Sequence, residues 1–174
     1  MTKFFTRIVF FLSFCILFAS QAHSQEEKYI TLYVYNFTKH IEWPDEYKEG
    51  DFIIDVIGHD SVYEKLKEML EGKNRGSQNF VVNHPANVDE IDPNCHILFV
   101  GHWRSQELDA AMKKVGSKGT LIVTEKGGML EKGADINLVI KNQKIMYEMK
   151  KSSITSRGLQ FSMDLTSLAE RVVD

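Results

Sequence analysis

Short, almost wholly apolar runs alternate in this chain with segments of helical periodicity, which limits it to a few architectures. The runs cover residues 52–58, 95–100 and 120–124, with a shorter one at 80–82. A strand that is apolar on both faces must lie in a sheet that is covered on both sides, whereas a half-exposed strand alternates apolar and polar residues. The pattern therefore predicts an α/β fold whose sheet is mostly parallel and lies between helices.

Helical periodicity supplies the layers that would cover this sheet. Apolar residues recur at helical spacing over residues 27–43, and Pro44 should end that first helix. A second helix would follow the run at 52–58, with Asp60 or Ser61 as its N-cap. A third helix, capped by Ser105, would precede the run at 120–124.

The last third of the chain has a different pattern. Residues 136–140 and 145–149 predict two strands, and Asn142-Gln143 between them favours an antiparallel hairpin. Residues 152–172, interrupted at Gly158, predict short helices packed on the sheet. The whole is expected to form a single three-layer Rossmann-like α/β domain, a mostly parallel sheet flanked by helices with a C-terminal antiparallel hairpin.

The first 24 residues have the pattern of an export signal. Lys3 and Arg7 precede an apolar run over residues 8–18, and small or polar residues follow up to Ser24. A membrane-spanning helix needs about 20 apolar residues, so the run is too short for an anchor. We expect a signal peptide over residues 1–24, cleaved after Ser24, and a single exported domain over residues 25–174.

Charge and cysteine content exclude several classes of protein. Loss of residues 1–24 removes two basic groups and no acidic group, which changes the formal net charge from -3 to -5. With basic residues scattered along the chain, no surface for nucleic acid is expected. Cys15 and Cys95 are too few for a disulfide scaffold. Cys95 lies in a predicted core strand, which favours a buried thiol over an intermolecular bridge or a reactive group.

The loops at the carboxyl ends of the parallel strands are the expected place for a ligand, near the point where strand order reverses. His59, Trp103, Arg104 and Glu125 lie in three such loops. His59 or Arg104 would pair with a charge and Trp103 would stack on a planar group, while helix N-termini favour an anion. A small anionic ligand bound by these four residues is one hypothesis; the alternative is capped loops with solvated side chains.

Neither a metal site nor a catalytic centre is predicted. The histidines after residue 24 lack the close spacing of ligands that share one helix or hairpin; they are His40, His59, His84, His96 and His102. The chain has no GxSxG elbow, and a core strand would raise the pKa of the Cys95 thiol. We therefore expect a binding protein without metal or cofactor rather than an enzyme.

Several segments, in order, resemble the YfiR family of small periplasmic proteins, including its HmsC-like members. The most specific is YNFTKHIEWP at residues 35–44, and the others lie at residues 95–99, 127–129, 147–149 and 158–162. The resemblance extends from about Tyr29 to Ala169. It implies that residues 25–174 form a YfiR-like periplasmic domain, a sheet flanked by helices that can dimerise.

The resemblance also implies a signalling regulator. Such a protein binds the periplasmic sensor region of an inner-membrane diguanylate cyclase or sensor histidine kinase, represses or modulates it, and so acts on cyclic-di-GMP and biofilm formation. Redox control through disulfides, which the resemblance also implies, is not expected here, because Cys95 is the only cysteine after residue 24.

The partner contact is expected beside two breaks in the chain, where Trp and Tyr could supply binding energy. It would comprise Trp43, Tyr47, Arg157, Leu159 and Phe161. For Trp43 the alternative is that it covers an edge of the core. For the whole protein the alternative is a periplasmic small-ligand sensor without a dedicated membrane partner. Whether the protein forms a homodimer is left open.

Overall fold

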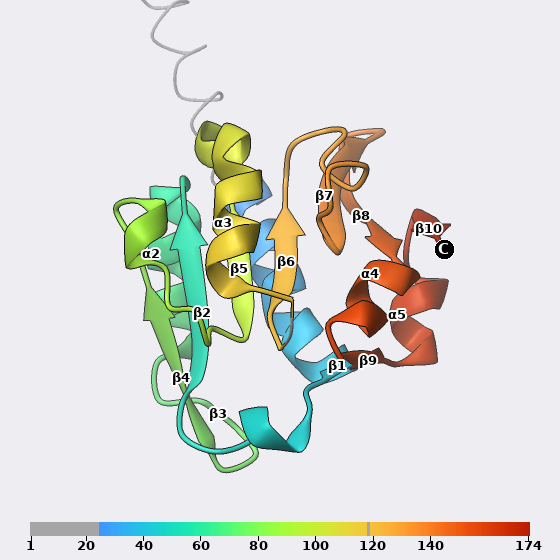
Figure 1. Cartoon of the computed structure of the whole chain (residues 1–174). Helices are drawn as coiled ribbons and strands as arrows, with labels where there is room; N and C mark the ends of the chain where they lie inside the picture. Colours follow the sequence, from blue (N-terminus) through green and yellow to red (C-terminus); the bar gives the residue numbers. More distant parts are fainter. Residues whose placement is uncertain (1–24, 118) are drawn as a thin grey trace, which may run out of the picture.

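A computed structural model of the chain describes residues 25–117 and 119–174 (Figure 1). The predicted signal peptide, residues 1–24, lies outside these described residues. Within them, no helix combines the length and apolar character needed to cross a membrane.

A mixed sheet of eight strands forms the centre of the described chain. Its order is β10-β8-β7-β6-β5-β2-β4-β3. The strands are β2 (Phe52–Ile57), β3 (Asn74–Arg75), β4 (Gln78–Asn83), β5 (Ile97–Val100), β6 (Leu121–Thr124), β7 (Ile136–Lys141), β8 (Lys144–Lys150) and β10 (Arg171–Val173). From β4 to β7 all neighbours are parallel, whereas β8 is antiparallel to β7 and β3 is antiparallel to β4. The fold is therefore α/β with a mostly parallel sheet, as the sequence predicts.

Helices cover both faces of this sheet. Residues 25–40 form the N-terminal helix, drawn in blue in Figure 1. The other α-helices are α2 (Asp60–Leu70), α3 (Leu108–Val115), α4 (Lys151–Ser156) and α5 (Met163–Ser167), and short 3-10 helices occupy Asp45–Tyr47 (η1), Val88–Glu90 (η2) and His102–Glu107 (η3). Figure 1 shows α3 on one side of the sheet and the N-terminal helix on the other.

Alternate residues of the central strands enter two separate cores. In β5, Ile97 and Phe99 pack in the core beneath the N-terminal helix and α2, whereas Leu98 and Val100 pack in the core beneath α3. Both faces of the strand are thus removed from water, which explains why the sequence of β5 is apolar throughout. The three-layer arrangement follows directly from this double burial.

Strand order reverses between β2 and β5. From β2 the chain passes through α2 to β4 on one side, and it then returns to β5 on the other side of β2. Adjacent connections that leave in opposite directions open a crevice at the carboxyl ends of the two strands. The segments that begin at Gly58 and Gly101 lie at this crevice.

Two short strands connect distant parts of the chain. β1 (Ile41–Glu42) pairs antiparallel with β9 (Gln160–Phe161) in a separate two-stranded sheet. The backbone N–H of Ser162 also donates to the oxygen of His40, 2.9 Å away. The predicted first helix therefore ends at residue 40, and the expected helical tail contains β9 and β10 as well as α4 and α5.

The predicted helix caps are wrong. The N-cap of α2 is His59 rather than Asp60 or Ser61, and its Nδ1 accepts from the backbone N–H of Val62. Ser105 lies within η3 and donates to the oxygen of His102, so it does not cap α3. The hairpin prediction holds: β7 and β8 are antiparallel, and Asn142 and Gln143 between them both have positive φ, as a type I′ turn requires.

Candidate functional site

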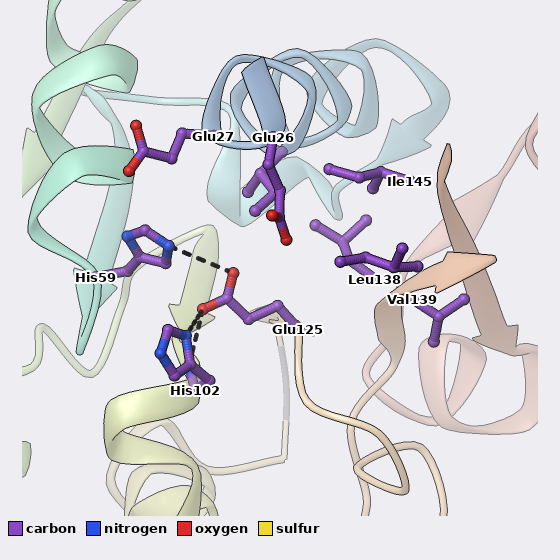
Figure 2. A pocket seen from close by; sticks show the side chains of 10 residues that line it. Glu26, Glu27, His59, His102, Glu125, Leu138, Val139 and Ile145 are labelled. Atoms are coloured by element: carbon purple, nitrogen blue, oxygen red, sulfur yellow. Dashed lines mark hydrogen bonds and ion pairs between the residues drawn. The ribbon is translucent and has the colours of Figure 1, made fainter. Parts of the chain in front are cut away.

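A cavity of about 220 Å³ lies beyond the carboxyl ends of β2, β5 and β6. One wall carries ionisable side chains from the strand ends and from the N-terminal helix: Glu26, Glu27, His59, His102 and Glu125. The opposite wall is aliphatic and comes mainly from the β7–β8 hairpin: Ile30, Leu138, Val139, Ile140 and Ile145. Figure 2 shows the two walls facing each other.

Two glycines, Gly58 and Gly101, allow His59 and His102 to lie close together. A Cβ added at Gly101 would lie 2.3 Å from the backbone oxygen of Gly58, and one added at Gly58 would lie 2.5 Å from the Cγ of Arg104. Gly58 also has a φ of +75°, which L side chains rarely adopt. The turns after β2 and β5 are thus in direct contact, and the rings of His59 and His102 lie 5.7 Å apart, centroid to centroid.

Glu125, which directly follows β6, joins the two histidines. Its Oε1 accepts the backbone N–H of His102 at 2.8 Å and lies 2.9 Å from Nδ1 of the same residue. Its Oε2 lies 3.7 Å from Nε2 of His59 (Figure 2). The side chain of Glu125 is 8% exposed, whereas that of His102 is 41% exposed. Within the described residues, its ion-pair partners are these two imidazoles, with no Lys or Arg among them.

The N-terminal helix adds two further carboxylates with different roles. Glu27 forms an ion pair with Nζ of Lys65 at 2.6 Å. Burial raises the pKa of Glu27, but hydrogen bonds from Lys65 and Ser61 outweigh burial and the net pKa is lowered. Figure 2 shows the side chain of Glu26 pointing into the cavity towards Glu125. Two carboxylates without a Lys or Arg ion pair therefore face the same space in the described structure.

Only two of the four residues predicted to bind a ligand line the cavity. His59 and Glu125 line the cavity, but Trp103 and Arg104 do not. Trp103 is 72% exposed, and Arg104 binds Glu107 at 2.7 Å and the backbone oxygen of Ala86 at 2.8 Å. The cavity therefore lacks the main cation expected to bind an anionic ligand, because the guanidinium of Arg104 is held outside it.

His102 is the site residue that sequence reasoning missed. A usable signal was present, because Gly58-His59 and Gly101-His102 repeat the same dipeptide directly after two apolar strands. Metal ligands need not be close along the chain when separate strand ends bring them together. Here His59, His102 and Glu125 come from three different strand ends, and their ligand atoms all lie within 4.8 Å of one another.

The predicted partner contact lies largely in the interior. Trp43 is 2% exposed, and Leu159 and Arg157 are also buried. This corrects their placement on a contact surface: Trp43 donates to the backbone oxygen of Gly119, and Arg157 pairs with the buried Asp135. Tyr47 and Phe161 are partly buried and pack against the same core.

Comparisons with known proteins support the fold and the family. The model of the YfiR/HmsC-like family matches residues 27–170. No curated protein matches the chain.

Solved structures similar to the chain are distant from it in sequence. The ABC domain in complex with L-Trp from Streptococcus pneumoniae is 10% identical with a TM-score of 0.52, over 70% of this chain and 55% of that one. A conserved domain protein from Vibrio cholerae is 10% identical with a TM-score of 0.47, over 70% and 54%. This chain thus spans about half the length of either. At this identity the first likeness shows a shared α/β fold only.

Proposed function

This chain belongs to the YfiR/HmsC-like family, and from that premise we propose that it is an exported, periplasmic regulatory protein in cyclic-di-GMP signalling. It binds the periplasmic sensor region of an inner-membrane diguanylate cyclase or sensor histidine kinase and represses or modulates that protein. The observation that carries the proposal is the family match, which extends over residues 27–170 and so includes the buried residues of both cores and every residue that lines the cavity except Glu26.

The state of the mature thiol supports binding rather than covalent catalysis. Cys95 is fully buried two residues before β5 begins, and burial raises its pKa well above the ordinary value for a thiol. The nucleophile in cysteine chemistry is the thiolate, which this environment disfavours. The same burial argues against regulation through a disulfide at this position.

We place the partner contact on the α5 surface, defined as Met163 and Leu168. These side chains are 87% and 66% exposed, and they lie at the two ends of α5. The surface directly follows β9, so it adjoins the segment in which the sequence placed the contact. Exposed apolar side chains contribute binding energy when a partner removes them from water.

Site-specific photocrosslinking in the native host tests this placement. A benzoylphenylalanine at position 163 or 168 should capture an inner-membrane signalling protein, identified by mass spectrometry. The matched control is position 113, because Lys113 is exposed on α3, which covers the opposite face of the sheet. Equal capture from all three positions, or none from 163 and 168, would contradict the α5 surface.

A paired substitution tests the regulatory effect. The double variant Met163→Glu, Leu168→Glu should weaken capture and change the cellular cyclic-di-GMP level or the kinase output. Trp103→Glu provides the control, since it places a charge at an equally exposed aromatic residue on η3. The proposal fails if both variants retain wild-type capture and output while remaining folded.

The cavity supports a second candidate function, a small-ligand sensor. Its volume of about 220 Å³ is below the roughly 300–1,000 Å³ of pockets for drug-sized ligands, so an ion or a very small molecule fits it best. Glu26 and Glu125 favour a cation over the anion expected from the sequence. A ligand should raise the melting temperature. A panel in which small cations have no effect and anions do would contradict this candidate.

A further inference from the structure

We propose that His59, His102 and Glu125 form a binding site for a divalent first-row transition metal ion, with zinc as the reference case. The inference deepens the sensor candidate by naming its ligand class, and it does not depend on the membrane partner. Two imidazoles and one carboxylate with a position left open form a known donor set for zinc. Imidazole also suits copper, nickel and iron, so the chemical class is broader than zinc.

The distances between the ligand atoms fit such an ion. Tetrahedral zinc with bonds of about 2.0–2.2 Å separates its ligand atoms by roughly 3.4 Å. Here Nδ1 of His102 and Oε1 of Glu125 are 2.9 Å apart, and Nε2 of His59 and Oε2 of Glu125 are 3.7 Å apart. Since all three residues offer atoms within 4.8 Å, closure around an ion requires movement on the order of 1 Å.

The three side chains are held by rigid parts of the fold. Each follows a central strand of the sheet, and the contact of Gly58 with Gly101 fixes the separation of the two histidines. The backbone N–H of His102 holds Oε1 of Glu125 at 2.8 Å. Hydrogen bonds of this kind orient metal ligands and strengthen their affinity.

Charge in the cavity also favours a cation. The side chain of Glu125 is 8% exposed and has two imidazoles as its ion-pair partners in the described chain, and Glu26 points towards it (Figure 2). A divalent ion would compensate both carboxylates. The cavity beside them leaves room for water or a small exchangeable ligand at the remaining coordination position.

Metal binding by His59 requires a change in the hydrogen bond by which this residue caps α2. Its Nδ1 accepts from the backbone N–H of Val62 at 3.4 Å, so the neutral ring carries its proton on Nε2. Metal binding at Nε2 moves that proton to Nδ1 and gives up the cap contact. The contact is longer than the usual 2.9–3.0 Å, and the N–H of Tyr63 still donates to the oxygen of His59 at 3.1 Å. The helix start therefore tolerates the change.

Metal titration of the exported protein, purified without a polyhistidine tag, tests the site. Cobalt(II) should bind at one equivalent and develop the intense visible bands of a low-symmetry, four- or five-coordinate ion, and zinc should displace it. Calorimetry with zinc should give the same stoichiometry. If neither ion binds at one equivalent, the proposal is overturned.

Two conservative variants assign the ligands. His59→Asn keeps a side chain that caps helices well but lacks Nε2, and Glu125→Gln keeps an acceptor for the N–H of His102. Loss of a residue that only hydrogen-bonds to a metal ligand lowers metal affinity roughly 10–100-fold. Loss of a ligand itself should cost at least as much, so each variant should weaken zinc binding by about 100-fold or more. His84→Asn, outside the cavity, should bind like wild type. Equal affinities in all three variants would overturn the assignment.

X-ray absorption at the zinc edge reads the ligand set in the wild-type protein, whatever the fate of the variants. We expect nitrogen and oxygen scattering with an imidazole signature. Sulfur at about 2.3 Å would instead place the ion at Cys95 and overturn the proposal. None of these measurements involves the membrane partner, so loss of metal binding and loss of partner capture are separately detected.

Discussion

The indole Nε1 of Trp43 donates a hydrogen bond to the backbone oxygen of Gly119, 2.8 Å away. The same indole packs edge-on against Phe52, with ring centroids 4.9 Å apart. Gly119 in turn donates its N–H to the oxygen of Arg157 at 2.9 Å. One aromatic side chain therefore ties the end of the N-terminal segment to the loop before β6, and through it to the loop after α4.

Trp43→Phe should destabilise the fold rather than a partner complex. The variant keeps an aromatic ring but leaves the buried oxygen of Gly119 without its indole donor, a loss of about 1–3 kcal/mol, with a further cost for the lost volume. Urea unfolding followed by far-UV circular dichroism measures the change. Trp103→Phe, at an exposed position, should stay within about 0.5 kcal/mol of wild type. Equal stability of the two variants would refute this role of Trp43.

Arg157→Met should be strongly destabilising. Its Nε lies 2.9 Å from Oδ2 of Asp135, which is fully buried, so the variant leaves a buried carboxylate without its cation at a cost of about 3–5 kcal/mol. Arg171→Met removes the pairs of a solvent-exposed guanidinium with Glu148 and Glu131 and should cost about 0–1 kcal/mol. Chemical denaturation of both variants gives the comparison. Similar losses of unfolding free energy in the two variants would contradict the prediction that the pair of Arg157 with Asp135 stabilises the fold more than a surface pair does.

His96 should make stability depend on pH. Its Nδ1 accepts from the N–H of Ile53 at 3.1 Å and its Nε2 lies 2.7 Å from the oxygen of Tyr47, an arrangement that suits the neutral ring. Burial lowers the pKa of His96 despite the hydrogen bond to Tyr47. Protonation therefore favours the unfolded chain, in which the pKa is about 6.5.

The expected sign follows from that lowered pKa. The contribution of His96 is complete above about pH 6.5 and is lost as the pH falls towards the pKa of the folded state. The free energy of unfolding should thus rise with pH across this window, and His96→Gln should remove that part of the slope. Subtracting the two curves cancels the groups they share. A difference that is constant between pH 5 and 8 would contradict the prediction.

The thiol of Cys95 should be unreactive in the folded protein. It is fully buried and burial raises its pKa well above the ordinary value, so both access and the thiolate are lacking. Iodoacetamide should modify it only in denaturant, as read by mass spectrometry. A Ser152→Cys variant supplies an exposed thiol that should react rapidly under native conditions. Comparable native rates at both positions would show that Cys95 is accessible.

Double burial explains which strands could be predicted from the sequence. β5 and β6 are buried along their whole length, so their apolar runs identify them without any knowledge of the partners. β1, β9 and β3 have two residues each, too few for a period, and β1 and β9 depend on each other across the chain. Such pairings are set by tertiary contacts and leave no local pattern.

The same distinction holds for the candidate site. His59 and Glu125 could be found because the ends of parallel strands predict a crevice. Trp103 lies in η3 and is 72% exposed, whereas its neighbour His102 lines the cavity, a difference that the sequence pattern does not predict. Trp43 was misplaced because its burial depends on Gly119 and on β9, contacts that only the folded chain supplies.

The N-terminal helix has its partners far along the chain, and this has a consequence for the time course of folding. The hydroxyl of Tyr33 donates to the oxygen of Ile145, and Ile41, directly after the helix, pairs with Phe161. Phe37, which packs edge-on against Tyr147, therefore lacks this partner until that distant part of the chain has been made. Closure of so long a loop slows folding and favours aggregation meanwhile. A holding chaperone should therefore have its greatest effect on yield before these distant partners of the N-terminal helix are available.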